Sequence, residues 1–147
     1  MPRINLSISQ QLFNELQVAA NAKKVPVNLI AVQALEQLFI KQTVNYSAFI
    51  TQIEKDIDAL PKEKNEFILS DLDSYTTLSI STVDNGEIKP SVLRATIGKA
   101  FNELVRNNSI KGVTRTYTTG RNGKPTLKFS HGAAVYSIDR KARSIEE

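Results

Sequence analysis

Three polar residues close to the N-terminus have side chains that can read the base edges of duplex DNA. Arg3, Asn5 and Ser7 alternate with the apolar residues Ile4, Leu6 and Ile8. This alternation predicts a strand with one polar and one apolar side. Arginine can donate two hydrogen bonds to guanine, asparagine pairs in the same manner with adenine, and serine serves either base. The pattern therefore predicts base contacts by these three residues, the alternative being an exposed strand that is simply solvated.

Other kinds of chemistry have little support in this sequence. Cysteine is absent and His131 is the only histidine, so disulfides, thiolate sites and multi-histidine metal sites are excluded. Asp71 and Asp73 resemble paired carboxylates, but their position favours a capped helix start. His131 precedes Gly132, which favours a loop or strand edge. We therefore expect no enzymatic activity, no metal and no cofactor.

The basic charge of the chain is concentrated in its last third. The net charge is +4, yet residues 89–147 hold twelve basic against four acidic residues, whereas residues 46–88 hold three basic against nine acidic ones. Such an asymmetry suggests an oriented surface for a polyanion, or else chance clustering on a solvated surface. No apolar run approaches the roughly 18 residues of a membrane span, and no signal segment is evident, so we expect a soluble cytoplasmic protein.

The elements that would hold the N-terminal strand are two helices. Ser9 is a suitable N-cap for a helix over residues 10–22, and Pro26 stands where a second helix over residues 27–41 begins. The second helix is apolar nearly all round, so it must be buried on more than one side. One strand and one helix cannot cover it, and a lone strand leaves its backbone groups unpaired. Two interlocked copies remove both defects, which predicts an obligate homodimer.

Residues 1–41 resemble a ribbon-helix-helix module of the Arc, MetJ and CopG type across the strand, both helices and their connection. The resemblance implies a two-stranded ribbon in the major groove, with base contacts from Arg3, Asn5 and Ser7. Many relatives carry a Gly-x-Ser/Thr-x-Ser stretch before the second helix, where this chain has Lys24-Val25-Pro26-Val27-Asn28. A hydroxyl contact to phosphate is thus in doubt, but the backbone amides at Val27 and Asn28 can still clamp a phosphate at the helix start.

The second half has mixed elements. Helical periodicity predicts helices over residues 48–60, 71–78 (capped by Ser70) and from Pro90, the last with a buried stripe of Leu93, Ile97, Ala100, Phe101 and Leu104. Strands are expected at residues 67–69, 110–118, 126–130 and 133–138, a turn at residues 84–86, and a basic hairpin tip at residues 120–125. Tyr117 and Phe129 are expected in the core, the alternative being that their rings are stacking platforms for bases.

The outer side of the helix from Pro90 forms a second candidate DNA surface together with the hairpin tip. An ordinary solvent-exposed helix mixes both charge signs, whereas this side has short polar groups and cations. The alternative is a solvated surface on a domain that binds protein. The predicted contacts are Ser91, Arg94, Lys99, Asn102, Arg106, Arg121 and Lys124.

Residues 53–138 resemble a small winged-helix family of uncharacterised bacterial proteins. The resemblance is carried by the stretches LPKEKNEFILSDL, RATIGKAFNELVRNNSI and AVYSI. The expected fold class is α+β: a ribbon-helix-helix intertwined dimer over residues 1–45, a winged-helix-like domain over residues 46–139 and a flexible tail over residues 140–147.

The function expected from these features is sequence-specific binding of double-stranded DNA by a bacterial, plasmid or phage transcriptional repressor. A close alternative is a DNA-organising accessory factor in plasmid replication, partition or conjugative transfer. A lower alternative is an antitoxin whose second domain binds a toxin, and a protein-interaction adaptor is a further rival. The expected partners are double-stranded DNA and a second copy of the chain, with a possible protein partner at residues 46–139, and the expected location is the nucleoid or a plasmid.

Overall fold

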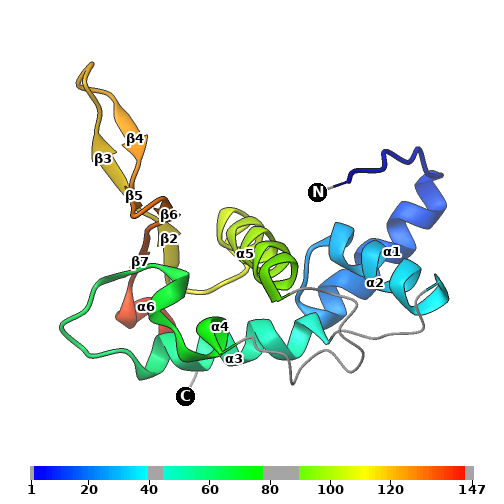
Figure 1. Ribbon diagram of the computed structural model, residues 1–147, viewed down its shortest axis with the longest axis horizontal. Helices are drawn as coiled ribbons and strands as arrows, with labels where there is room; N and C mark the ends of the chain where they lie inside the picture. Colours follow the sequence, from blue (N-terminus) through cyan, green and yellow to red (C-terminus); the bar gives the residue numbers. More distant parts are fainter. Residues whose placement is uncertain (1, 40–44, 78–89, 145–147) are drawn as a thin grey trace. The chain divides into compact units, whose positions relative to one another are not determined.

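The computed structural model describes residues 2–39, 45–77 and 90–144, and its chain forms two compact units, residues 1–43 and 44–147 (Figure 1). The expected boundary, after residue 45, lies two residues beyond the observed one. The architecture is mixed α and β, with small antiparallel sheets confined to the second unit in the described part of the chain.

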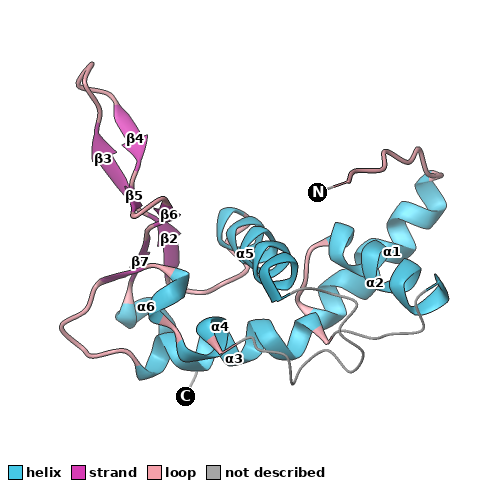
Figure 2. Ribbon diagram, viewed as in Figure 1, coloured by secondary structure: helices cyan, strands magenta, loops and turns pink. Residues whose placement is uncertain are grey.

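Unit 1 consists of an extended segment and two helices, α1 (Gln10–Lys23) and α2 (Val27–Phe39) (Figure 2). The predicted N-cap is confirmed, because the Ser9 side chain accepts a hydrogen bond from the amide of Leu12. Helix α1 ends with Lys24 in the left-handed conformation. The amides of Lys24 and Val25 then bond back to the carbonyls of Asn21 and Ala20, which is a Schellman arrangement. Residues 40 and 41 of the predicted second helix lie outside the described residues.

The hydrophobic core of unit 1 is very small. Within residues 2–39 the buried hydrophobic side chains are Ala20, Val25, Leu29 and Ile30. Most other large apolar side chains of this segment are exposed, including those on the side of α2 opposite its two buried residues: Val32, Leu35, Leu38 and Phe39. A chain segment of about 40 residues without disulfides usually needs a metal or a partner to fold. A single copy of unit 1 therefore buries too little apolar surface to account for its folding.

The principal helices of unit 2 follow the predicted periodicity. Helix α3 (Tyr46–Ala59) begins after the Asn45 cap, two residues before the expected start, and helix α5 (Pro90–Arg106) buries the whole predicted stripe. The short helix was misplaced: residues Leu69–Asp71 form a 3-10 turn (η1), and helix α4 (Asp73–Thr76) follows it without a cap from Ser70. The expected turn at residues 84–86 lies outside the described residues.

Three strands far apart in the sequence form the main sheet of unit 2. Strand β7 (Tyr136–Ile138) lies between β1 (Glu66–Phe67) and β2 (Val113–Arg115), and both pairs are antiparallel. Two further strand pairs continue from it, namely β3 (Tyr117–Thr119) with β4 (Pro125–Leu127), and β5 (Phe129–Ser130) with β6 (Ala133–Ala134).

Each of the three predicted strands in this region is therefore interrupted in the middle. The interruption occurs where Thr116, Lys128 and Val135 exchange backbone hydrogen bonds among themselves. Thr116 is buried at this junction, and its hydroxyl lies within hydrogen-bond distance of Ser137. Beyond the junction the β3–β4 hairpin extends away from the main sheet (Figure 1).

An aromatic cluster lies at the centre of unit 2. The ring of Tyr136 stacks on Phe67 at 5.4 Å and meets the edge of Phe101 at 5.0 Å, so that β1, β7 and α5 are joined through three buried rings. Aromatic pairs at these separations contribute about 0.5–1.5 kcal/mol beyond their buried area. The cluster fixes α5 against the sheet and thereby positions the outer surface of α5.

Residues 140–144 are structured, whereas we expected a flexible tail over residues 140–147, of which residues 145–147 lie outside the described residues. Residues Arg140–Arg143 form helix α6, which Asp139 caps by accepting from the amides of Lys141 and Ala142. Arg140 Nη2 donates to the carbonyls of Pro61 and Lys64, at 2.8 and 3.0 Å, and Arg143 Nε pairs with Asp58 at 2.7 Å. These two arginines attach the segment to the end of α3 and the loop behind it.

Replacing Arg140 with alanine is expected to lower the free energy of unfolding of unit 2 by about 2 kcal/mol. Hydrogen bonds from a charged donor contribute about 1.5–3 kcal/mol, and the bonds to the carbonyls of Leu60 and Lys64 are partly buried. Lys141→Ala is the matched control, because Lys141 is exposed and a change there is expected to stay within about 0.5 kcal/mol. Urea unfolding followed by circular dichroism measures both. Equal effects of the two variants would contradict the proposed attachment.

Candidate nucleic-acid interface

The three predicted base-reading residues lie on the extended segment before α1. Arg3, Asn5 and Ser7 are exposed, as the prediction requires. The apolar residues between them are exposed too: Ile4 by 80 %, Leu6 by 67 % and Ile8 by 43 %. Among the described residues this segment pairs with no strand. Both sides of the segment are thus open in a single copy, although only one of them is polar.

The start of α2 keeps the backbone geometry that a phosphate site requires. Pro26 precedes the helix, and its carbonyl accepts from the amides of Leu29 and Ile30. Val27 and Asn28 occupy the first two helical positions, where the helix offers no carbonyl to their own amides. Asn28 is exposed and Val27 is half-buried. The amides and the positive end of the helix dipole can together hold one anionic oxygen group.

The outer side of α5 brings several predicted contacts together. Lys99, Asn102 and Arg106 line one shallow depression of about 500 Å³, with Glu103 and Asn107 at its border. Lys99 and Arg106 are exposed, as is Ser91 near the start of the helix. Arg94 is half-buried on the flank, and its carbonyl accepts from the Tyr75 hydroxyl at 3.2 Å. The depression therefore carries two cations and one acid.

Asn102 has a role that the sequence did not reveal. Its Oδ1 atom accepts from Arg115 Nη1 at 2.8 Å and from the Tyr136 hydroxyl at 3.4 Å. The guanidinium of Arg115 lies 5.4 Å from the ring centre of Phe129 and 5.5 Å from that of Tyr136. Its Nε and Nη2 atoms are buried without a hydrogen-bond partner in the described structure. Asn102 thus anchors a buried cation beside α5, and its carbonyl oxygen is already engaged.

The buried phenol of Tyr136 gives unit 2 a dependence on alkaline pH. Burial raises the pKa of Tyr136 to about 12, against an opposing effect of the Arg115 charge. The neutral phenol is favoured in the folded state, so its contribution to stability is fully present below pH 10 and is lost as the pH rises towards 12. Wild-type protein is therefore expected to lose about 1–2 kcal/mol more than Tyr136→Phe between pH 9.5 and 11.5. Urea unfolding at both pH values tests this, and parallel losses would contradict it.

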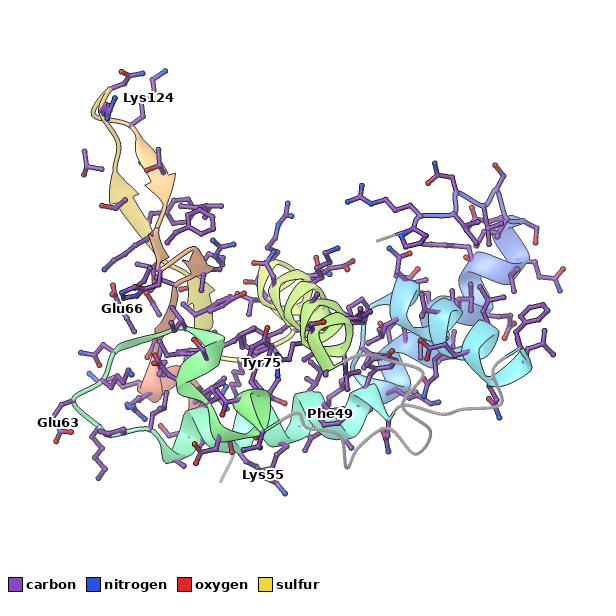
Figure 3. All side chains as sticks on the ribbon, viewed as in Figure 1. Phe49, Lys55, Glu63, Glu66, Tyr75 and Lys124 are labelled. Atoms are coloured by element: carbon purple, nitrogen blue, oxygen red, sulfur yellow. The ribbon has the colours of Figure 1, made fainter. Side chains whose placement is uncertain are left out.

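The hairpin tip is basic and exposed, as predicted. Arg121 and Lys124 both lie in the turn between β3 and β4, which is closed by a hydrogen bond from the Gly120 amide to the Lys124 carbonyl at 2.8 Å. Gly123 has a φ of +70°, a conformation that favours glycine. Figure 3 shows Lys124 at the far end of the hairpin. The two cations stand apart from the residues gathered on α5.

The expectation that Tyr117 and Phe129 belong to the core was wrong. Tyr117 is 62 % exposed and Phe129 is 60 % exposed. Both lie on the hairpin or at its base, beyond the part of the sheet that α5 covers. Each of the two lies two residues from Arg115 or Leu127 and so shares a strand side with that residue. Such a side can be buried or exposed, so the sequence pattern alone could not decide.

The residues considered for catalysis occupy structural positions. His131 is exposed in the tight turn between β5 and β6, with a φ of +50°. Asp71 accepts from the Ile68 amide at 3.0 Å and pairs with Lys64, and Asp73 lies in the first turn of α4. Among residues 2–39, 45–77 and 90–144 there is no group of three potential metal-ligating side chains, and no helix is long and apolar enough to cross a membrane.

The structure thus places the predicted contacts in four separate places: the extended N-terminal segment, the start of α2, the outer side of α5 and the hairpin tip. A scan against models of protein families and searches of curated proteins and of solved structures found no match to this chain.

Proposed function

We propose that the protein is a homodimeric, sequence-specific DNA-binding protein that acts as a transcriptional repressor. The observation that carries this proposal is the extended N-terminal segment, whose apolar residues Ile4, Leu6 and Ile8 are all exposed in the single chain. An unpaired strand with an open apolar side is an aggregation hazard that proteins normally cover. A second copy supplies the same strand, so antiparallel pairing satisfies both backbones.

The partner is a second copy because the remaining apolar surface of unit 1 requires one as well. The exposed residues Val32, Leu35 and Leu38 lie on one side of α2, opposite its two buried residues, Leu29 and Ile30. Two such helices packed across a dyad would bury that side, while the ribbon would bury Ile4, Leu6 and Ile8 beneath it. A two-fold interface of this kind places the same residues against each other. The result is the ribbon-helix-helix arrangement expected from residues 1–41.

Pairing the two strands leaves their polar sides together on one surface. Arg3, Asn5 and Ser7 of both copies then form a ribbon whose width suits the major groove of B-DNA. Val27 and Asn28 at the start of α2 hold the flanking phosphates through their amides. Base reading by the ribbon and positioning by the helix starts together provide sequence-specific recognition.

The order of helices and strands in unit 2 supports the interpretation of this unit as a winged-helix domain. The order of helix α3, strand β1 and helices α4 and α5, followed by strands that include a projecting hairpin, is the order expected for a winged helix and supports this proposal. Lys99 and Arg106 on α5, with Arg121 and Lys124 on the hairpin, add contacts to nucleic acid. The antitoxin alternative is less favoured because unit 2 packs its own aromatic core.

Footprinting on the DNA upstream of the protein's own coding sequence tests the repressor role. We expect protection of a short repeated site that overlaps the promoter, because occlusion of a promoter is the simplest action of a bound dimer. Protection elsewhere, at a replication or transfer origin, would instead support the accessory role. Uniform protection without a preferred site would contradict sequence-specific recognition.

A further inference from the structure

Three apolar side chains share one exposed side of the hairpin region. Tyr117 and Leu127 are direct partners across strands β3 and β4, and Phe129 follows Leu127 by two residues. Residues at this spacing point to the same side of a strand. Leu127 ends β4 and Phe129 begins β5, but the Lys128 amide between them bonds to the Thr116 carbonyl, in register with the Tyr117–Leu127 pair, so we place Phe129 on the same side. All three are exposed, Leu127 by 40 %. An exposed cluster of this kind marks a binding surface more often than a single exposed apolar residue does.

The ring of Phe129 is held in place although most of its side chain is open. Arg115 lies against it at 5.4 Å, and Arg115 is itself fixed by Asn102 and by the buried Tyr136. A cation over an aromatic ring is attracted by the electrons of the ring face, which stabilises that arrangement. Because the ring is already positioned, little further conformational entropy is lost when a flat partner stacks on it.

The surroundings of this surface are strongly basic. Between Glu103 and Asp139 the chain has six lysine and arginine residues and no acidic residue, and one of the six, Lys128, is paired with Glu66 of β1 at 2.7 Å. A separate groove of about 460 Å³ passes from α5 to the turn between β5 and β6. Lys99, Asn102 and Arg115 line it among mostly uncharged residues, whereas the three apolar residues of the hairpin do not line it. The tip beyond the rings carries Arg121 and Lys124. This charge favours a polyanion over a protein partner, whose interface cores are depleted in lysine.

We propose that the side of the hairpin formed by Tyr117, Leu127 and Phe129 binds single-stranded DNA. Proteins that bind single strands combine a positive groove with aromatic rings on which unpaired bases stack. A duplex does not fit this surface as well, because its base faces are already stacked and only edges are open in the grooves. Phosphates would meet Lys124 and Arg121 at the tip and Lys99 in the groove.

This inference goes beyond the proposed function and does not depend on the N-terminal ribbon. A dimer that reads a duplex site through unit 1 and holds an unpaired strand through unit 2 is suited to DNA that has been locally opened. Binding of single-stranded DNA by unit 2 therefore supports an accessory role in replication or transfer as the second candidate function.

The first test replaces both rings with leucine, which keeps apolar area but removes the flat π surface. The full-length Tyr117→Leu/Phe129→Leu variant is titrated with a fluorescent oligothymidine and with a duplex of matched length. Base stacking gives about tenfold in affinity per ring, so we expect a loss of about 100-fold for the single strand and less than twofold for the duplex. The control is Thr118→Ala/Thr126→Ala, at a strand pair on the other side of the hairpin, which should change neither affinity.

The second test uses Phe129→Trp. The chain contains no tryptophan, so the indole is a single fluorescent reporter on the proposed platform. Oligothymidine should quench this fluorescence, and the matched duplex should not. An Arg3→Ala variant should bind the single strand normally, which separates this proposal from ribbon-based recognition.

The proposal is overturned by either of two results. The leucine variant could retain its affinity for the single strand within twofold, which would assign the surface to a protein partner. Alternatively, the leucine variant could weaken binding to single strand and duplex equally, which would mean that no unpaired base stacks there.

Discussion

Leu35→Glu is expected to convert the protein into a monomer in which unit 1 is unfolded. In the single chain Leu35 is exposed on α2, where a surface substitution would change stability by no more than about 0.5 kcal/mol. In the proposed dimer the same residue lies between two α2 helices, and a buried unpaired carboxylate costs several kcal/mol. Sedimentation should therefore show half the wild-type mass, and circular dichroism should show loss of the helical signal of α1 and α2.

Gln37→Glu is the matched control, since it introduces the same charge into the same helix at an exposed residue about half a turn away from Leu35. This variant should remain a folded dimer. If Leu35→Glu also leaves mass and helicity unchanged, or if wild-type protein sediments at micromolar concentration as a folded monomer, the dimer is wrong.

Arg3→Ala and Asn5→Ala are each expected to reduce the preference for the cognate duplex. Each bidentate base contact that is lost costs roughly 1–3 kcal/mol, which corresponds to a 5- to 150-fold loss in affinity for the specific site. Binding to random duplex should fall less, because phosphate contacts carry it. Competition titrations at fixed salt give both affinities.

Gln17→Ala, on the exposed part of α1, is the control for these two variants and should leave the ratio of specific to random affinity unchanged. If Arg3→Ala and Asn5→Ala also leave this ratio unchanged, the ribbon does not read bases. If the affinities for the specific site and for random duplex fall equally, Arg3 contacts phosphate and does not read a base.

Helices with a one-sided apolar stripe could be predicted well from the sequence. The Ser9 cap and the stripe of Leu93, Ile97 and Phe101 each depend on residues less than about three turns apart, so local spacing contains the information. The ends of the helices were predicted less accurately than their stripes. Helix α3, for example, begins directly after the Asn45 cap, before the first apolar residue of its helical pattern.

Contacts between distant residues could not be predicted in this way. Helix α6 is stabilised by Arg140 and Arg143, whose partners lie at Leu60, Lys64 and Asp58, roughly 75–85 residues earlier. From sequence alone, two arginines in a charged C-terminal segment resemble a solvated tail. The same limit explains the interrupted strands, because the break at Thr116 depends on backbone bonds to Lys128 and Val135.

The candidate interface was predictable to a different extent in each unit. Alternation alone placed Arg3, Asn5 and Ser7 on an exposed segment, whereas the engagement of Asn102 by Arg115 required the fold. Tyr117 and Phe129 were assigned to the core because most rings are buried, but the hairpin extends beyond the helices that could cover them.

Selection from a pool of random duplexes tests the central proposal, recognition of DNA sequence by the paired N-terminal strands, most directly. The wild-type protein and the Arg3→Ala/Asn5→Ala variant are each passed through several rounds against the same pool. We predict that wild-type protein enriches a short repeated motif, in keeping with a two-fold symmetric reader, and that the variant enriches none. Enrichment of the same motif by both proteins, or of no motif by wild-type protein, would contradict the account.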